Sequence, residues 1–159
     1  MNKEQKEILI NDLMPRLRYG VKVLIEGFDV EKKQKTTSIE KVVGIDERFI
    51  YTKVIDEQTK KEIGDNKHLI DRTTIKPYLF TMESLTHEQR TEISEGIKNI
   101  NKKHPPFGAI KSEGTDNLLN NITMAASWLI NFYIERHLDY NGLIEKNIAI
   151  NCQNLNIYE

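Results

Sequence analysis

The first hydrophobic pattern along the chain has helical spacing. In residues 3–14, Ile8, Leu9 and Leu13 recur on one side, and charged side chains occupy much of the remainder. Such a stripe predicts an amphipathic helix. Pro15 disfavours helical dihedral angles at the residue before it, so we expect this helix to end or kink near residue 14.

Between residues 20 and 76 the pattern changes to the two-residue period of strands. Apolar side chains alternate along the segment 21–25, and the segments 38–45 and 49–55 form a predicted hairpin. Two further short strands are expected at 67–70 and 73–76. About five short strands at such intervals are typical of a small barrel or sandwich. We therefore predict a small antiparallel β-barrel of the SH3-like type.

The remainder of the chain has helical patterns. Thr86-His87-Glu88-Gln89 has the form of a capping box, which predicts a helix over residues 86–99. Residues 101–114 contain two prolines and two glycines and are predicted to form a linker. One long amphipathic helix is predicted over 116–137, with an apolar stripe of Leu118, Leu119, Ile122, Ala125, Ala126, Leu129 and Tyr133.

These elements together predict an α+β protein in two parts. Residues 1–82 hold the predicted N-terminal helix and small β-barrel, and residues 83–159 form a helical C-terminal region packed on it. A chain of 159 residues has the usual size of one domain. We therefore expect one compact unit.

The charge balance of the chain argues against one class of function, nucleic-acid binding. Lys and Arg number 23 and Asp and Glu number 24, which gives a net charge of -1. A nucleic-acid binder usually carries a basic stripe, because contacts with phosphate supply most of its affinity, so this balance argues against nucleic acid.

The N-terminus is charged where a signal peptide is apolar, and no apolar stretch approaches the roughly 20 residues of a membrane span. We expect a cytoplasmic protein without a membrane contact.

The sequence contains no recognisable catalytic motif. The histidines at positions 68, 87, 104 and 137 form no His-x-x-x-His pair, and Cys152 is the single cysteine. No serine lies in a Gly-x-Ser-x-Gly turn, and the glycines form no phosphate-binding loop. We therefore predict no catalytic residue, no metal, no cofactor and no enzymatic activity. His137 lies at the end of the long predicted helix, where we interpret it as a cation that interacts with the helix dipole.

Four aromatic side chains are candidate contacts for a partner. Tyr78 and Phe80 follow Pro77, and together they could form an exposed binding platform. They could equally close one end of the barrel, which is the ordinary role of such residues. Trp128 and Phe132 widen the edge of the long helical stripe, where exposed aromatics often anchor interfaces.

Three blocks of sequence carry a resemblance to a known family. They are YGVKV at 19–23, IKPYLF at 75–80 followed by Met82 and THEQR at 86–90, and HLDYNGLI at 137–144 preceded by Trp128-Leu129. In this order the blocks resemble a family of short uncharacterised proteins abundant in human-gut anaerobes and their prophages. The resemblance implies an origin in a mobile element, and it implies no activity and no role for any residue.

The sequence thus favours a small non-enzymatic protein-interaction module of prophage or mobile-element origin. Its partner would be another protein or a second copy of the chain. The alternative is a nucleic-acid-associated accessory protein, since small barrels often have such roles. A basic face on the folded surface would favour that alternative, because a neutral chain can still separate its charges in space.

Overall fold

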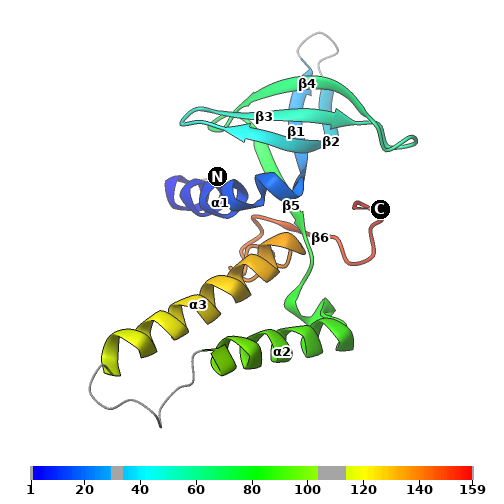
Figure 1. Ribbon diagram of the computed structural model, residues 1–159. Coiled ribbons are helices and arrows are strands. Elements are labelled where there is room, and N and C mark those ends of the chain that lie inside the picture. The colour runs from blue at the N-terminus through cyan, green and yellow to red at the C-terminus, as the bar shows by residue number, and fades with distance from the viewer. Residues whose placement is uncertain (1, 30–33, 104–113, 159) are drawn as a thin grey trace.

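The protein has an α+β fold, with one helix before a sheet and two helices after it (Figure 1). The computed structural model describes residues 2–29, 34–103 and 114–158. The linker predicted at 101–114 lies outside the described residues except at its two ends. In chain order the elements are α1 Lys3–Arg16, the 3-10 turn η1 Leu17–Tyr19, β1 Lys22–Asp29, β2 Gln34–Ile45, β3 Phe49–Ile55, β4 Glu62–Leu69, β5 Thr74–Leu79, the 3-10 turn η2 Met82–Ser84, α2 His87–Lys103, α3 Gly114–Glu135 and β6 Ile150–Asn151.

The six strands form one open sheet in the order β4-β3-β2-β1-β5-β6. All neighbours are antiparallel except β5 and β6, which are parallel. The prediction of a small barrel is therefore wrong, because β4 and β6 are two separate edges. In a closed barrel the strand at one edge of the sheet would pair with the strand at the other edge. Here the sheet ends at β4 on one side and at β6 on the other.

One face of the sheet holds the main hydrophobic core. The helix α1 lies against this face and contributes Leu9 and Leu13, which are fully buried, as its spacing predicts. An Asn2 capping box, in which Gln5 donates its N–H to the Asn2 side chain at 2.8 Å, begins the helix. Pro15 lies inside the last turn, and α1 nevertheless continues to Arg16, two residues beyond the expected end. The sheet contributes Val23, Ile25, Val42, Ile50 and Ile75.

The opposite face of the sheet is partly covered by the C-terminal segment. Cys152 and Ile157 are buried there against Tyr78, and Leu24 and Ile39 pack on the same cluster. The N–H of Cys152 donates to the carbonyl of Leu79 at 2.9 Å, which continues the β5–β6 pairing. The C-terminal segment is therefore part of the fold of the sheet, although the sequence assigned it to the helical region.

The helices α2 and α3 extend away from the sheet side by side (Figure 1). Near the sheet, Leu85, Phe132 and Leu138 form a third buried cluster. Further along α3, Trp128 is half-buried, whereas Met124 and Ile130 are 46% and 43% exposed. The side chains of Leu118, Leu119 and Ile122 lie outside the described residues, so the amphipathic stripe as a whole stays a prediction.

The α2–α3 contact depends on a glycine. A Cβ atom added at Gly96 would lie 2.4 Å from Cη2 and 2.5 Å from Cζ2 of the Trp128 ring. Alanine is the better helix former by about 1 kcal/mol, but its Cβ atom would force the Trp128 ring or the two helices to move. We expect Gly96→Ala to lower the free energy of unfolding by about 1–3 kcal/mol. Because Trp128 is the single tryptophan, its fluorescence emission should shift to longer wavelength.

Gly64→Ala on β4 is the matched control, since nothing lies within 4 Å of the Cβ position there. This variant should keep the emission spectrum of the wild type. Gly96→Ala with unchanged emission and an equal or higher melting temperature would contradict the close α2–α3 contact.

Candidate functional site

The candidate site lies where four segments of the chain meet, at the end of β5. Phe80 follows β5 and binds the segment that follows α3 through its backbone. Its N–H donates to the carbonyl of His137 at 2.9 Å, and its carbonyl accepts from the N–H of Asp139 at 2.8 Å. The turn η2 with the start of α2, and the C-terminal segment, complete the junction.

His137 ends α3 in a conformation that is unusual for its residue type. Its φ of 52° lies in the left-handed region, where a helix commonly ends on glycine. A side chain with a Cβ costs roughly 1–2 kcal/mol there. The next turn is held by the Asp139 carboxylate, which accepts the N–H groups of Leu143 and Ile144, both at 2.7 Å. The fold thus keeps His137 in a strained position at the junction.

The imidazole of His137 is buried, with 6% of the residue exposed. It stacks on the Tyr158 ring at 4.1 Å between centroids with 13° between the planes. Its Nδ1 atom is buried and has no hydrogen-bond partner among the described residues. Burial, and secondarily the charge of Arg16, lower the pKa of this imidazole to about 4. The interpretation of His137 as a cation at a helix end is therefore wrong, because burial keeps the ring neutral at pH 7.

The junction is tied to α1 by a buried ion pair. Nε of Arg16 lies 2.8 Å from Oδ2 of Asp12, and Nη2 of Arg16 donates to the carbonyl of Leu138 at 2.9 Å. Asn141 donates its side-chain amide to the other oxygen of Asp12 at 3.0 Å. These bonds hold the carbonyl of Leu138 and the side chain of Asn141, so α1 positions the residues that follow His137.

A cavity of about 420 Å³ opens at this junction. We call it the junction cavity. Its wall combines aromatic and aliphatic side chains with hydroxyl, amide, guanidinium and imidazole groups, and it contains no carboxylate, thiol or lysine. The lining residues are Phe80, Ser84, Thr86, Gln89, Arg136, His137, Leu138, Gln153 and Tyr158.

Most polar groups in this wall already have a structural role. Thr86 and Gln89 form the predicted capping box, in which the Thr86 N–H donates to the Gln89 side chain at 2.9 Å. Ser84 donates its hydroxyl to the carbonyl of Thr81 at 2.6 Å. The Arg136 guanidinium is 3.0 Å from the Glu92 carboxylate, so its charge is balanced. The cavity is therefore polar but nearly neutral, with lone pairs and amide groups still available.

The four aromatic residues predicted as partner contacts lie in two hydrophobic clusters that share Phe80: Trp128 and Phe132 belong to the cluster of Leu85 and Leu138, and Tyr78 belongs to the cluster of Cys152 and Ile157. Phe80 lines the junction cavity, whereas Trp128 packs against Gly96 between the helices. Tyr78 and Phe132 are buried, at 6% and 4% exposed, so neither ring is open to a partner in this structure. A role of these four residues in binding stays a prediction.

Sequence reasoning missed the other members of the cavity wall. His137 and Leu138 open the block at 137–144 that carries the resemblance, but that block contained no sign of a cavity. Arg136 and Gln153 are polar residues, which the hydrophobic pattern of the sequence assigns to the surface. Tyr158 is placed by its hydroxyl, which donates to the carbonyl of Tyr78 at 2.7 Å across 80 positions of sequence.

Cys152 is near the junction but is not a nucleophile in this state. It is fully buried, and burial raises the pKa of its thiol to about 11. The reactive species of cysteine is the thiolate, so this thiol is inert at neutral pH.

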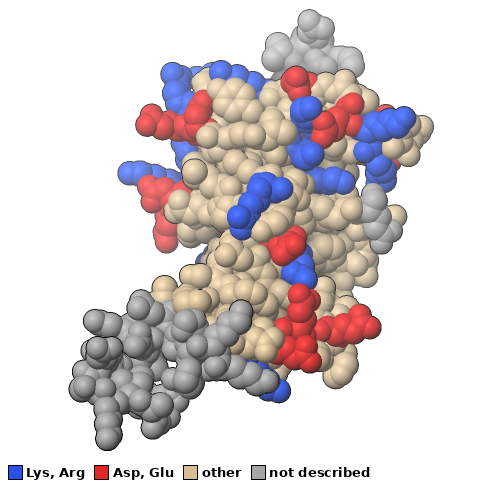
Figure 2. All heavy atoms as spheres, viewed as in Figure 1, with Lys and Arg blue, Asp and Glu red and all other residues tan. Residues whose placement is uncertain are grey.

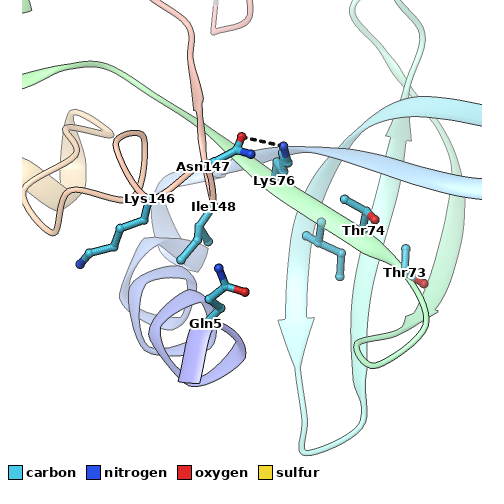
Figure 3. A pocket seen from close by; sticks show the side chains of 8 residues that line it. Gln5, Thr73, Thr74, Lys76, Lys146, Asn147 and Ile148 are labelled. Atoms are coloured by element: carbon cyan, nitrogen blue, oxygen red, sulfur yellow. Dashed lines mark hydrogen bonds between the residues drawn. The ribbon is translucent and has the colours of Figure 1, made fainter. Parts of the chain in front are cut away.

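A second, smaller cavity of about 250 Å³ lies between α1, β5 and residues 146–148 (Figure 3). Lys76 and Asn147 point toward one another there, and the Lys76 amine donates to the Asn147 side chain at 3.0 Å. Lys146 extends away from Lys76 and donates to the carbonyl of Asn141 at 3.0 Å. Its two lysines thus bind neutral oxygens of the protein itself and do not converge on one point.

The uncovered part of the outer sheet face has mixed charges. Glu62 accepts from Lys41 at 2.9 Å and from Lys53 at 2.8 Å, and the Lys67 amine lies 3.7 Å above the Phe49 ring. Figure 2 shows basic and acidic side chains interspersed over the part of the molecule formed by the sheet. The described residues of this face therefore form no continuous basic stripe.

In the described part of the chain, no group of three or more His, Cys, Asp or Glu residues could hold a metal ion. Within the same residues, no helix is both long and apolar enough to cross a membrane.

Comparison with protein-family models, with curated proteins and with solved structures finds no match to this chain. The junction cavity must therefore be interpreted from its own chemistry.

Proposed function

We propose that this protein is a non-enzymatic interaction module that holds a short segment of a partner protein in the junction cavity. The observation that carries the proposal is a cavity with a strained, buried histidine in its wall, whose Nδ1 has no partner among the described residues. Buried polar atoms are nearly always hydrogen-bonded, and strained residues concentrate at functional sites. A volume of about 420 Å³ lies within the range of ligand sites.

The chemistry of the wall favours a peptide over a charged ligand. Serine, threonine and glutamine side chains both donate and accept, which matches the N–H and C=O groups of a peptide backbone. Phe80, Leu138 and Tyr158 offer apolar contact for one side chain of that segment. Arg136 is already balanced by Glu92, so a free anion would have to displace a carboxylate.

The absence of enzymatic activity in this proposal rests on the titratable groups of the wall. A general acid or base works best when its pKa is near the working pH. The pKa of His137 is lowered to about 4, and burial raises the pKa of Tyr158 well above its ordinary value. The Ser84 hydroxyl donates to a backbone carbonyl and forms no hydrogen bond with a basic side chain of the described residues. The origin in a prophage or mobile element is supported by the sequence resemblance alone.

The alternative of a nucleic-acid-associated protein gains no support from the described surface. Such a protein would need a basic face, whereas Lys41 and Lys53 of the outer sheet face are paired with Glu62 and Lys67 lies over an aromatic ring.

The cavity can be tested by filling it. Gln153 is exposed and lines the cavity, so Gln153→Trp should occupy the space without removing a buried group. Peptides selected from a random phage-displayed library on the full chain should bind Gln153→Trp at least about tenfold more weakly, a loss of about 1.4 kcal/mol. Fluorescence polarisation with labelled copies of the selected peptides measures this.

Asn154→Trp is the matched control, because Asn154 is the next residue, is exposed and does not line the cavity. It should bind the selected peptides like the wild type. The proposal fails if the library yields no binder, or if Gln153→Trp and Asn154→Trp bind equally well.

A further inference from the structure

The strand β4 forms one edge of the sheet, and β5, which leads to the junction cavity, lies near the other (Figure 1). Residues 62–67 of this edge strand are exposed, and β3 is the only described strand that pairs with it. It contains no proline that would interrupt pairing on its open side. An unpaired edge is a template for another strand, unless charge or irregular geometry prevents it.

The hydrogen-bonding direction of each residue of β4 follows from one bond at its end. The N–H of Ile70 donates to the carbonyl of Arg48, the residue before β3, at 3.0 Å, and the register from Leu69 to Gly64 is uninterrupted. In an antiparallel ladder the direction of the backbone groups alternates along the strand. Leu69, Lys67 and Asp65 therefore direct their N–H and C=O groups toward the open side.

We propose that β4 pairs with β4 of a second copy of this chain, antiparallel and centred on Asn66. In this register the outward-facing Asp65 of each copy lies opposite the outward-facing Lys67 of the other. Each such pair can exchange both of its backbone N–H···O=C bonds. The two-fold symmetry of the pair repeats this match on both sides of Asn66, so the edge is complementary to itself.

Neighbouring registers lack this match. Moving the centre by one residue to Asp65 places two aspartates opposite one another, and moving it to Lys67 places two lysines opposite one another. Like charges directly opposite on adjacent strands are destabilising, whereas opposite charges contribute roughly 0.2–1 kcal/mol. The charge pattern of β4 thus selects one register.

Both charged groups are available for the second copy. Asp65 forms no ion pair among the described residues, and Lys67 is exposed, with its amine over the Phe49 and Tyr51 rings at 3.7 and 5.1 Å. The register shift between Gly64 and Glu62 limits the regular part of β4 to residues 64–69, so the Asn66-centred ladder spans residues 64–68. A ladder this short buries less area than a standard interface, so we expect a weak dimer that forms at high protein concentration.

The pairing can be tested by exchanging the two charges. Asp65→Lys alone brings lysines face to face, Lys67→Asp alone brings aspartates face to face, and the double exchange restores opposite charges. Sedimentation velocity over a concentration series should show a self-association of the wild type that each single variant weakens by about tenfold or more. The double variant should associate like the wild type. An equimolar mixture of the two single variants should form a heterodimer, because each then faces its opposite charge.

Circular dichroism of each variant verifies that it is folded, and Lys98→Glu on α2 controls for a change of net charge at an exposed position. A wild type that remains monomeric at millimolar concentration overturns the proposal, and β4 is then an edge protected by its charges. Self-association that both single variants retain overturns it as well, because another surface is then responsible. Loss of association in the single variants without recovery in the mixture rejects the Asn66-centred register.

Discussion

Replacing Asp12 by alanine is expected to lower the free energy of unfolding by about 3–5 kcal/mol. Asp12 and Arg16 are both fully buried, and Arg16 binds the carboxylate through Nε at 2.8 Å and Nη2 at 3.0 Å. Without Asp12 the guanidinium remains buried without a counter-charge. Its Nη1 already has no partner among the described residues, and the remaining bond of Nη2 is to the neutral carbonyl of Leu138.

The loss would extend beyond α1. Arg16 also binds the carbonyl of Leu138, and Asp12 accepts from Asn141, so the pair connects α1 to the turn after His137. A domain of this size has roughly 5–15 kcal/mol of stability, of which this substitution removes a large part. Urea unfolding followed by circular dichroism measures the difference.

An exposed ion pair between the same helix and the turn after β4 provides the control. Asp71 binds Lys6 of α1 while 72% of its side chain is exposed, so Asp71→Ala should cost at most about 1 kcal/mol. The double variant Asp12→Leu with Arg16→Met removes both charges and should recover most of the stability. An Asp12→Ala variant that unfolds within 1 kcal/mol of Asp71→Ala would show that the buried pair is unimportant.

Local sequence patterns predicted those elements of the fold that carry a clear signal of their own, such as an apolar stripe or a capping box. The apolar stripe at Ile8, Leu9 and Leu13 predicted α1, and the capping box at Thr86 predicted the start of α2 to within one residue. Alternation predicted β1, β2 and β3. It placed β4 poorly, because the strand Glu62–Leu69 is almost wholly exposed and has no apolar alternation. Its position comes from pairing with β3.

The failure of the barrel prediction has the same origin. Whether a sheet closes depends on which strand pairs with the last edge, and that choice is made by distant parts of the chain. Here the short β6 at Ile150–Asn151 takes the free side of β5. Two residues of strand carry too little pattern to reveal a partner more than 70 positions away.

The candidate site was hidden for a related reason, because its polar residues look like surface residues in sequence. Asp12 and Arg16 have the spacing of an ordinary exposed helical pair, and only the structure shows that both are buried. The left-handed conformation of His137 gave no signal, since glycine marks such positions and histidine does not. The burial of Glu40 is a different case, because the alternation of β2 places Glu40 on the same inward-facing side as Ser38 and Val42.

Glu40 is the second position where we expect a large effect, and there the effect depends on pH. Its side chain is 1% exposed. Ser38 donates to it at 2.6 Å, Asn66 at 3.0 Å and Thr52 also donates, while Nε2 of His68 lies 2.7 Å away. Burial acts to raise the pKa of this carboxyl, but the hydrogen bonds, that of His68 first, outweigh it and hold the pKa at about 2.

The direction of the pH effect follows from that pKa. The ordinary value is 4.5, so between pH 4.5 and 2 the unfolded chain binds a proton at Glu40 that the folded protein does not. The stabilisation by Glu40 is therefore fully present above pH 4.5 and is lost as the pH falls toward 2. With about 1.36 kcal/mol for each unit, it amounts to about 3 kcal/mol.

Urea unfolding of the wild type and of Glu40→Gln at pH 7, 5, 3.5 and 2.5 tests this expectation. Glu40→Gln should be less stable by about 3 kcal/mol at pH 7, because its neutral amide cannot accept the same donors as the carboxylate. The difference should shrink steadily below pH 4.5 as the wild type loses the contribution of its charge. Glu26→Gln, at an exposed carboxylate of the neighbouring strand β1, should follow the wild type at every pH. A difference between Glu40→Gln and the wild type that stays constant from pH 7 to 2.5 would mean that the ionised carboxylate does not hold β2, β3 and β4 together.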